Sequence, residues 1–230
     1  MIIPTYEQAK QYEKDYTYIP VCREILADDV TPILMLRKLA ALDGQYFLLE
    51  SVEGGNLGRY SFLGYHPKLS VSCKNGVVKV KENGMVRILP GKPKEALQSL
   101  LEQYRSPQIE GLPTFTGGLV GYFAYETIQY AEPKLHIKQS DVNDFELMMF
   151  DKLLAFDQVM HKLCIIVNAR TADGEAGYNK AVEEIDAFIE TLRITEPIPY
   201  EKPQKALEFT CNLSKEEYCS MVEKTKHYIK

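Results

Sequence analysis

The chain has 230 residues, of which 45% are hydrophobic and 26% are charged, and its formal net charge at pH 7 is −5. This is an ordinary globular composition for one large domain or two small ones, and the lysines and arginines form no basic stripe, which argues against a nucleic-acid partner. No apolar run approaches the roughly 20 residues of a membrane helix, and the N-terminus lacks the apolar core of a signal peptide, so we expect a cytoplasmic protein.

Hydrophobic periodicity and capping signals divide the chain into short helices and strands. In chain order we expect a helix over 5–16, a strand over 18–26, a helix over 31–42, a strand over 46–51, three strands within 69–89, a helix over 93–104, a strand over 118–122, a short helix over 125–131, two strands within 145–169 and a helix over 177–192. Thr5 opens a capping box, and Thr31 followed by Pro32 starts the second helix. Pro20 favours an edge position or a bulge for its strand. The strand over 46–51 is apolar enough to be buried on both faces.

Two Asn-Gly pairs, at 75–76 and 83–84, divide the segment 69–89 into three short β-rich runs. Asn-Gly tolerates the positive φ angles of a type I′ turn, so we predict a three-stranded antiparallel meander. The positions that share an apolar face within each strand are Leu69, Val71 and Cys73, then Val78 and Val80, then Val86 and Ile88. Lys79 and Lys81 are expected on the opposite, solvated side.

Strands that occur in meanders and hairpins, with helices between them, predict an α+β fold of antiparallel sheets with flanking helices rather than a βαβ arrangement. The five cysteines are widely spaced without a CxxC pair, so neither a disulfide framework nor a zinc site is expected. Cys73 and Cys164 lie in strand-like runs and are expected in the core. The four histidines show no metal-ligand spacing.

The amino-acid composition changes near the C-terminal end of the sequence. Residues 194–208 combine three prolines with charges, which is typical of a connector between domains. Ser214 and Glu217 then form a predicted capping box for a helix whose apolar stripe needs a surface to pack against. We therefore expect a domain over 1–193, a linker over 194–208 and, over 209–230, the beginning of a second domain of a longer protein.

The stretch FLLESVEGGNLGRYSFLGY places polar groups between two apolar strands. Glu50 can accept hydrogen bonds from an ammonium group, Ser51 can donate to a carboxylate, and Arg59 can hold a carboxylate in bidentate fashion. Tyr60 and Phe62 could cover an apolar side chain, so these groups together could recognise a free amino acid. A structural ion pair between Glu50 and Arg59 beside a glycine turn also explains the pattern, because a buried carboxylate needs a partner.

Several blocks of this sequence carry a resemblance to a known family. FLLESVEGGNLGRYSFLGYHP, GGLVGYFAYETIQYAEP and DFELMMFDKLLAFDQVMHKL resemble the N-terminal region of the large subunit, component I, of anthranilate synthases. FTCNLSKEEYCSMVEKTKHYIK resembles the segment that opens the chorismate-binding domain of the same enzymes. The resemblance covers nearly the whole chain, and separated blocks in the right order are more specific than any single motif.

The inhibitor-site motifs of that family match two parts of the polar stretch and one helix start. The family's LLES matches Leu48 to Ser51, its GRYSF matches Gly58 to Phe62, and its Thr-Pro matches Thr31 and Pro32. The resemblance implies that the residues binding L-tryptophan are Pro32, Leu49, Glu50, Ser51, Arg59, Tyr60, Ser61 and Phe62. It also implies the fold of the N-terminal domain of anthranilate synthase component I.

The resemblance further implies that the full-length subunit is a lyase of L-tryptophan biosynthesis, which converts chorismate and ammonia to anthranilate and pyruvate with Mg2+. A glutamine amidotransferase subunit, component II, supplies the ammonia, and L-tryptophan inhibits the enzyme. No position here matches the family's chorismate-binding or Mg2+-binding residues, so no catalytic or metal residue is carried over. We expect the Mg2+ ligands and the rest of the tryptophan pocket beyond Lys230, and no catalysis by these residues alone.

Two other interpretations stay open on the sequence. One is the corresponding part of aminodeoxychorismate synthase component I, a related folate-pathway enzyme that uses the same substrate. The pair Glu50-Ser51 followed by GRYSF favours anthranilate synthase over it. The other is a stand-alone, non-catalytic amino-acid-binding domain, and the apolar stripe from Tyr218 to Ile229 argues against it because that stripe would remain unburied.

Overall fold

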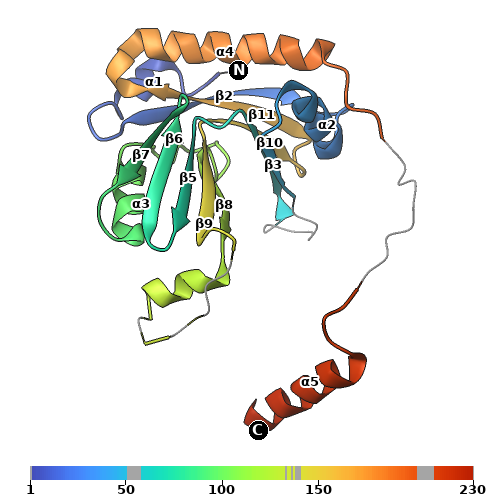
Figure 1. Ribbon diagram of the computed structural model, residues 1–230. Coiled ribbons are helices and arrows are strands. Elements are labelled where there is room, and N and C mark those ends of the chain that lie inside the picture. The colour runs from blue at the N-terminus through green and yellow to red at the C-terminus, as the bar shows by residue number, and fades with distance from the viewer. Residues whose placement is uncertain are drawn as a thin grey trace. The chain divides into compact units, whose positions relative to one another are not determined.

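The computed structural model describes residues 2–50, 58–132, 134, 135, 137, 141–200 and 210–229. The chain divides into two compact units, Met1–Ile198 and Pro199–Lys230 (Figure 1). No helix within the described residues is both long enough and apolar enough to cross a membrane.

Two antiparallel sheets with flanking helices make up the first unit, which confirms the predicted α+β class. In spatial order, the six-stranded sheet contains β1 (Ile2–Ile3), β2 (Tyr18–Leu26), β11 (Lys162–Arg170), β10 (Lys152–Asp157), β4 (Tyr60–Tyr65) and β3 (Tyr46–Leu49). The five-stranded sheet contains β7 (Met85–Leu89), β6 (Val77–Glu82), β5 (Leu69–Lys74), β9 (Phe145–Phe150) and β8 (Gly118–Phe123). The helices are α1 (Tyr6–Lys10), α2 (Pro32–Leu42), α3 (Pro93–Glu102) and α4 (Gly174–Ile194), with 3-10 helices η2 (Tyr125–Tyr130) and η3 (Thr171–Asp173).

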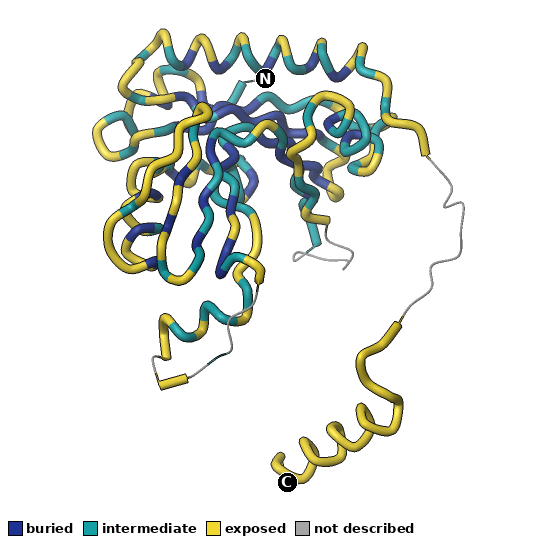
Figure 2. Tube along the Cα trace, in the orientation of Figure 1, coloured by how far each residue is buried: buried dark blue, intermediate teal, exposed yellow. Residues whose placement is uncertain are grey.

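Three apolar clusters hold these layers together. Helix α4 packs against β11 and β2, and its buried residues, which recur at the helical period, are Tyr178, Ala181, Ile185, Ile189 and Leu192. Helix α3 covers one face of the five-stranded sheet through Ala96 and Leu100. A third cluster, which includes Phe150, Leu153 and Ile166, lies where the two sheets meet. Figure 2 shows the buried residues gathered along the strands and on the inner side of α4.

Local signals in the sequence were reliable where they act within a few residues. Thr5 caps α1 with a full capping box, and Thr31 caps α2 by accepting a hydrogen bond from the Leu34 amide. The meander β5–β6–β7 has positive φ angles at both Asn-Gly turns, for example 51° at Asn75 and 78° at Gly76. These predictions are confirmed because each depends on a contact between close neighbours in the chain.

The segment 145–169 was predicted as two strands, and this is wrong. It forms three, because the chain leaves the five-stranded sheet at Phe150 and enters the six-stranded sheet at Lys152. Asp151 is the single residue between these strands, and its side chain accepts a hydrogen bond from Lys68 at 3.4 Å. A continuous apolar run does not reveal that its two halves belong to different sheets.

Strand β3 was expected to be buried on both faces, and this is also wrong. It ends at Leu49 and forms the edge of the six-stranded sheet next to β4, where Leu49 is 48% exposed and Glu50 is exposed. Pro20 was expected in an edge strand or at a bulge, but β2 lies between β1 and β11. The described ladder with β1 includes Cys22 and Arg23, and the ladder partner of Pro20 is Asn168 on β11.

Two smaller expectations also need correction. Helix α1 ends at Lys10 rather than near Tyr16, because the amides of Tyr12, Glu13 and Asp15 donate to carbonyls three residues back instead of four. In β7, Val86 and Ile88 pair with Lys81 and Lys79 and share the exposed face of the lysines. An apolar pattern on an edge strand therefore did not identify the buried face.

The second unit contains α5 (Lys215–Ile229). The Glu217 amide donates to Ser214 Oγ at 3.1 Å, and the Ser214 amide donates to Glu217 Oε2 at 2.8 Å. This reciprocal pair confirms the capping box read from the sequence, and it lowers the pKa of the Glu217 carboxyl.

We predict that Ile185→Ala lowers the free energy of unfolding by about 2–5 kcal/mol, because it leaves a cavity in the core beneath α4. Ile185 is 0% exposed, whereas Ile194 on the same helix is 80% exposed. Ile194→Ala is therefore the matched control and should change stability by less than about 0.5 kcal/mol. Urea unfolding of both variants measures the two values, and equal losses would contradict this account of the core.

Candidate ligand site at the start of β4

The predicted ligand residues Arg59 to Phe62 lie where β4 begins beside the end of β10. Tyr60 and Asp157 are partners in the ladder between these two strands. The Nε and Nη2 groups of Arg59 donate to Asp157 Oδ2 at 3.0 and 2.5 Å. Arg59, the charged residue of the GRYSF motif, is therefore bound to a carboxylate that lies 98 positions away in the chain.

The carboxylate of Asp157 is buried, and both of its oxygens accept hydrogen bonds. It is 6% exposed, and its Oδ1 atom accepts hydrogen bonds from the amides of Val159 and Met160, both at 3.0 Å. Burial acts against ionisation of Asp157, but the hydrogen bonds from Arg59 and from the two amides outweigh it, so its pKa is lowered. The bond to Asp157 in turn raises the pKa of Arg59.

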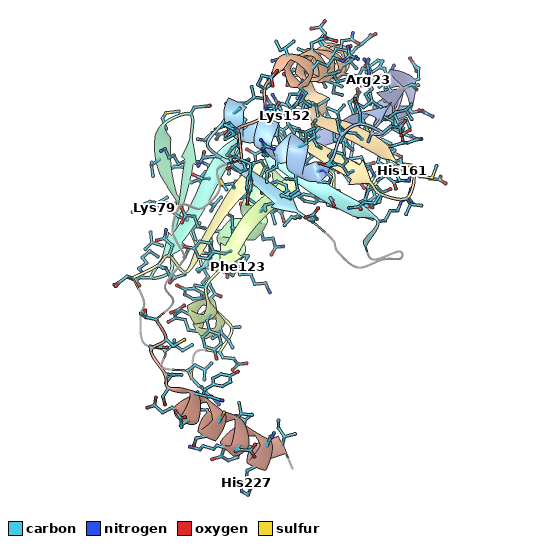
Figure 3. The ribbon with its side chains drawn as sticks, turned by 90° about the vertical axis from the view of Figure 1, so that its right-hand side faces the viewer. Arg23, Lys79, Phe123, Lys152, His161 and His227 are labelled. Atoms are coloured by element: carbon cyan, nitrogen blue, oxygen red, sulfur yellow. The ribbon has the colours of Figure 1, made fainter. Side chains whose placement is uncertain are left out.

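Gln158 ties the same turn to β4 at two further points. Its amide donates to the carbonyl of Arg59 at 2.9 Å, and its Nε2 group donates to Ser61 Oγ at 2.8 Å. Ser61 is 0% exposed, so this bond satisfies a hydroxyl that water does not reach. The labels of Lys152 and His161 in Figure 3 mark the start of β10 and the turn that follows it.

An aromatic row adjoins the guanidinium group. Arg59 lies over the ring of Tyr60, 4.9 Å from its centroid, and the rings of Tyr60 and Phe62 are 5.8 Å apart. Phe62 meets Phe115 edge to face at 5.5 Å, and Leu49 is the ladder partner of Phe62 on β3. Burial, together with the negative charge of Asp157, raises the pKa of Tyr60.

The predicted residues divide between the two faces of the six-stranded sheet. Leu49, Tyr60 and Phe62 share one face, because ladder partners lie on the same side and strand residues alternate. Ser61 points to the other face. Pro32 begins α2, whose Met35 and Leu39 belong to the core beneath α4, also on that other face.

Of the remaining predicted residues, Glu50 is exposed at the end of β3, and Ser51 lies outside the described residues. The interpretation of Glu50 and Arg59 as a buried ion pair is wrong, since Glu50 is exposed and Arg59 pairs with Asp157. Sequence reasoning also missed Asp157 and Gln158. The available signal was a pair of polar residues that ends the apolar run LLAF just before a turn.

The arrangement suits a ligand with a carboxylate and an apolar body. The side chain of Arg59 is 42% exposed although it is bound to Asp157. Among the residues that the structure describes, none accepts a hydrogen bond from its Nη1 group, so this edge of the fork can bind a carboxylate. Tyr60 and Phe62 offer aromatic surface beside it. Within the same described ranges, no three His, Cys, Asp or Glu side chains are grouped as a metal site.

A separate groove of about 600 Å³ lies between α3 and η2. Its lining is mostly apolar and includes Leu97, Leu101, Phe123, Tyr130 and Phe145. None of the residues predicted to bind a ligand contributes to it. The groove therefore does not coincide with the site at the start of β4.

Comparisons with known proteins agree on one family. The sequence profile of a family described as chorismate binding enzyme matches residues 45–230. Anthranilate synthase component 1 of Acetivibrio thermocellus is 34% identical over 242 aligned residues, which cover 100% of this chain and 49% of that protein. The corresponding protein of Acinetobacter calcoaceticus is 35% identical, with 94% of this chain and 45% of that protein covered. The chain thus spans about half the length of the curated relatives it matches.

A solved structure agrees with the fold. The crystal structure of anthranilate synthase component I from Streptococcus pneumoniae TIGR4 superposes with a TM-score of 0.58 over 88% of this chain and 44% of that chain. The sequence identity is 23%, so the likeness supports the architecture of the two sheets and not the details of a site.

The ion pair between Arg59 and Asp157 makes stability depend on pH. Because the pKa of Asp157 is lowered in the folded chain, its charge stabilises the fold above the ordinary aspartate pKa of about 3.9, and this contribution is lost as the pH falls through the lowered value. We predict that Asp157→Asn is less stable than the parent at neutral pH and that the gap narrows below about pH 4.

Urea unfolding between about pH 7 and about pH 3 measures that gap. Asp186→Asn is the control, because Asp186 also pairs with an arginine, Arg23, but is 48% exposed. An exposed pair contributes little, so this variant should stay close to the parent at every pH. A gap for Asp157→Asn that does not change with pH would contradict the assigned charge.

Proposed function

The chain belongs to the chorismate-binding enzyme family, and from this membership we propose that it forms the regulatory, L-tryptophan-binding part of an anthranilate synthase component I. The observation that carries the proposal is the match to proteins named anthranilate synthase component 1 along the whole chain, with Arg59 and its aromatic neighbours in the segment that the resemblance assigns to the inhibitor.

We propose that the complete subunit is a lyase that converts chorismate and ammonia to anthranilate and pyruvate in L-tryptophan biosynthesis. A glutamine amidotransferase subunit, component II, would supply the ammonia. Mg2+ would polarise the substrate when bound, and its ligands would come from the chorismate-binding domain of the complete subunit. The role proposed for these residues is regulation.

The proposed regulation follows from the chemistry of the ligand. Arg59 would hold the carboxylate of L-tryptophan through its open Nη1 edge, and Glu50 would accept hydrogen bonds from the ammonium group. Tyr60 and Phe62 would cover part of the indole ring. Support comes from the exposure of Glu50 at the edge strand and from the anchored position of Arg59.

Inhibition requires that tryptophan binds one conformation of the complete protein more tightly than another. A ligand shifts an equilibrium only by its difference in affinity for the two states. We propose that the conformation favoured by tryptophan turns over chorismate poorly. Binding of substrate and of inhibitor would then oppose each other by the same factor, as linkage demands for two coupled sites.

We predict that Glu50→Lys in the complete protein raises the inhibition constant for L-tryptophan about tenfold or more, because an ammonium group would face a like charge instead of a carboxylate. Ser51→Phe is expected to act in the same direction. The measurement is the inhibition constant beside the KM for chorismate, so that lost inhibition is separated from lost activity.

Glu190→Lys is the matched control, since Glu190 is an exposed glutamate on α4 that pairs with Arg193. It should leave the inhibition constant unchanged. Equal inhibition constants for Glu50→Lys and the parent would count against the assigned site. A parent that forms 4-amino-4-deoxychorismate and is not inhibited by added tryptophan would instead identify the folate-pathway enzyme.

A further inference from the structure

We propose that Asp157 and Gln158, in the turn after β10, are positioning residues of this ligand site. They hold Arg59, Tyr60 and Ser61 in a fixed arrangement before any ligand binds. Neither residue belongs to the motifs that the sequence resemblance assigns to the inhibitor. The inference rests on the proposed function, because the ligand it concerns is the L-tryptophan of that proposal.

The first argument is the geometry of the guanidinium group. Asp157 engages Nε and Nη2 of Arg59 with a single oxygen, Oδ2, at 3.0 and 2.5 Å. Its other oxygen is held by two backbone amides, so the carboxylate itself cannot turn freely. The arginine is therefore fixed along one edge, and its opposite edge remains directed away from Asp157.

The second argument is that Gln158 holds the backbone on both sides of Tyr60. Its main chain binds the carbonyl of the preceding residue, Arg59, and its side chain binds the hydroxyl of the following residue, Ser61. Ser61 is fully buried, so water does not compete for the second of these bonds. Tyr60 between them is held beneath the guanidinium group.

Pre-ordering of this kind strengthens binding. A free arginine side chain loses rotamer entropy when it closes on a carboxylate, and that loss weakens the complex. In this protein Asp157 has already ordered the side chain during folding. The ligand would therefore meet a guanidinium group whose position is set, as is required for a planar, bidentate contact.

The hydrogen bonds of Asp157 and Gln158 also stabilise the hairpin of β10 and β11, so the test must separate positioning of the ligand site from folding. Asp157→Asn keeps the shape of the side chain but removes its charge, and Asp157→Glu keeps the charge on a longer stem. Gln158→Met keeps the approximate volume and removes the donor to Ser61. Asp186→Asn removes a carboxylate from another arginine pair of the six-stranded sheet, that with Arg23, and is the control.

In the complete protein, we expect Asp157→Asn to raise the inhibition constant for L-tryptophan about tenfold or more, relative to the KM for chorismate. Gln158→Met should raise it about threefold or more, since a neutral hydrogen bond is weaker than a charged one. Asp157→Glu should recover part of the loss. Asp186→Asn should match the parent. Rescue by the charged variant is a result that a purely structural role would not produce.

The 230-residue chain gives a second readout that needs no inhibitor. The Nε–H resonance of Arg59 should be slow to exchange with water in the parent and fast in Asp157→Asn, with little change in Asp186→Asn. A slowly exchanging Nε–H in Asp157→Asn would overturn the anchoring. If Asp157→Asn fails to fold, Gln158→Met carries the inhibition test alone.

The outcomes separate the inference from the function on which it rests. A parent inhibited by tryptophan, with unchanged inhibition constants in Asp157→Asn and Gln158→Met, would overturn the positioning role and leave the proposed function standing. A complete parent protein that is not inhibited would overturn the proposed function, whereas the exchange of the Arg59 Nε–H would still report whether Asp157 anchors it.

Discussion

Two neighbouring segments of the chain pass directly from one sheet into the other, and this double crossing holds the first unit together. One segment turns at Asp151, the single residue between β9 and β10, and the other passes through Lys68 between β4 and β5. The segments are paired on both sides of the crossing, as β4 with β10 and as β5 with β9. Lys68 spans the crossing by donating to Asp151 and to Tyr18, and its ammonium group lies over the rings of Tyr18 and Tyr104. The two sheets are therefore joined by the backbones of two paired segments as well as by side chains.

The crossing requires close packing at its inner corner. The rings of Phe47 and Phe150 meet there edge to face, with centroids 4.8 Å apart. Gly64 lies beside them on β4, and a Cβ atom at this position would come within 2.2 Å of the Phe47 ring and 2.9 Å of Phe150. Any larger residue would force the rings of Phe47 and Phe150 to move. Phe47 of β3 is thus packed closely against β4 at this corner.

Two buried carboxylates, Asp157 and Asp144, connect neighbouring elements of the first unit by hydrogen bonds. Asp157 binds Arg59 and the turn before β11, and it stands on β10, which has a neighbouring strand on each side. Asp144 accepts from Tyr130 at 2.6 Å and from the Gly76 amide at 3.3 Å, which ties η2 to the turn between β5 and β6. In both cases hydrogen bonds compensate the desolvation of the charge. The candidate site consequently combines an arginine anchored to a central strand with a glutamate at an exposed edge.

The sequence by itself determined the features that depend on near neighbours or on family likeness. These are the caps at Thr5, Thr31 and Ser214, the Asn-Gly turns and the antiparallel α+β class, whereas the candidate ligand residues from Leu49 to Phe62 stay a prediction. Only the tertiary structure decided that Arg59 pairs with Asp157 and not with Glu50, that β3 is an edge strand, and that Tyr60 and Ser61 face opposite sides of the sheet. The physical reason is that strand order and register arise from packing between segments about a hundred residues apart, whereas capping, turns and alternation arise from contacts within a few residues of the chain.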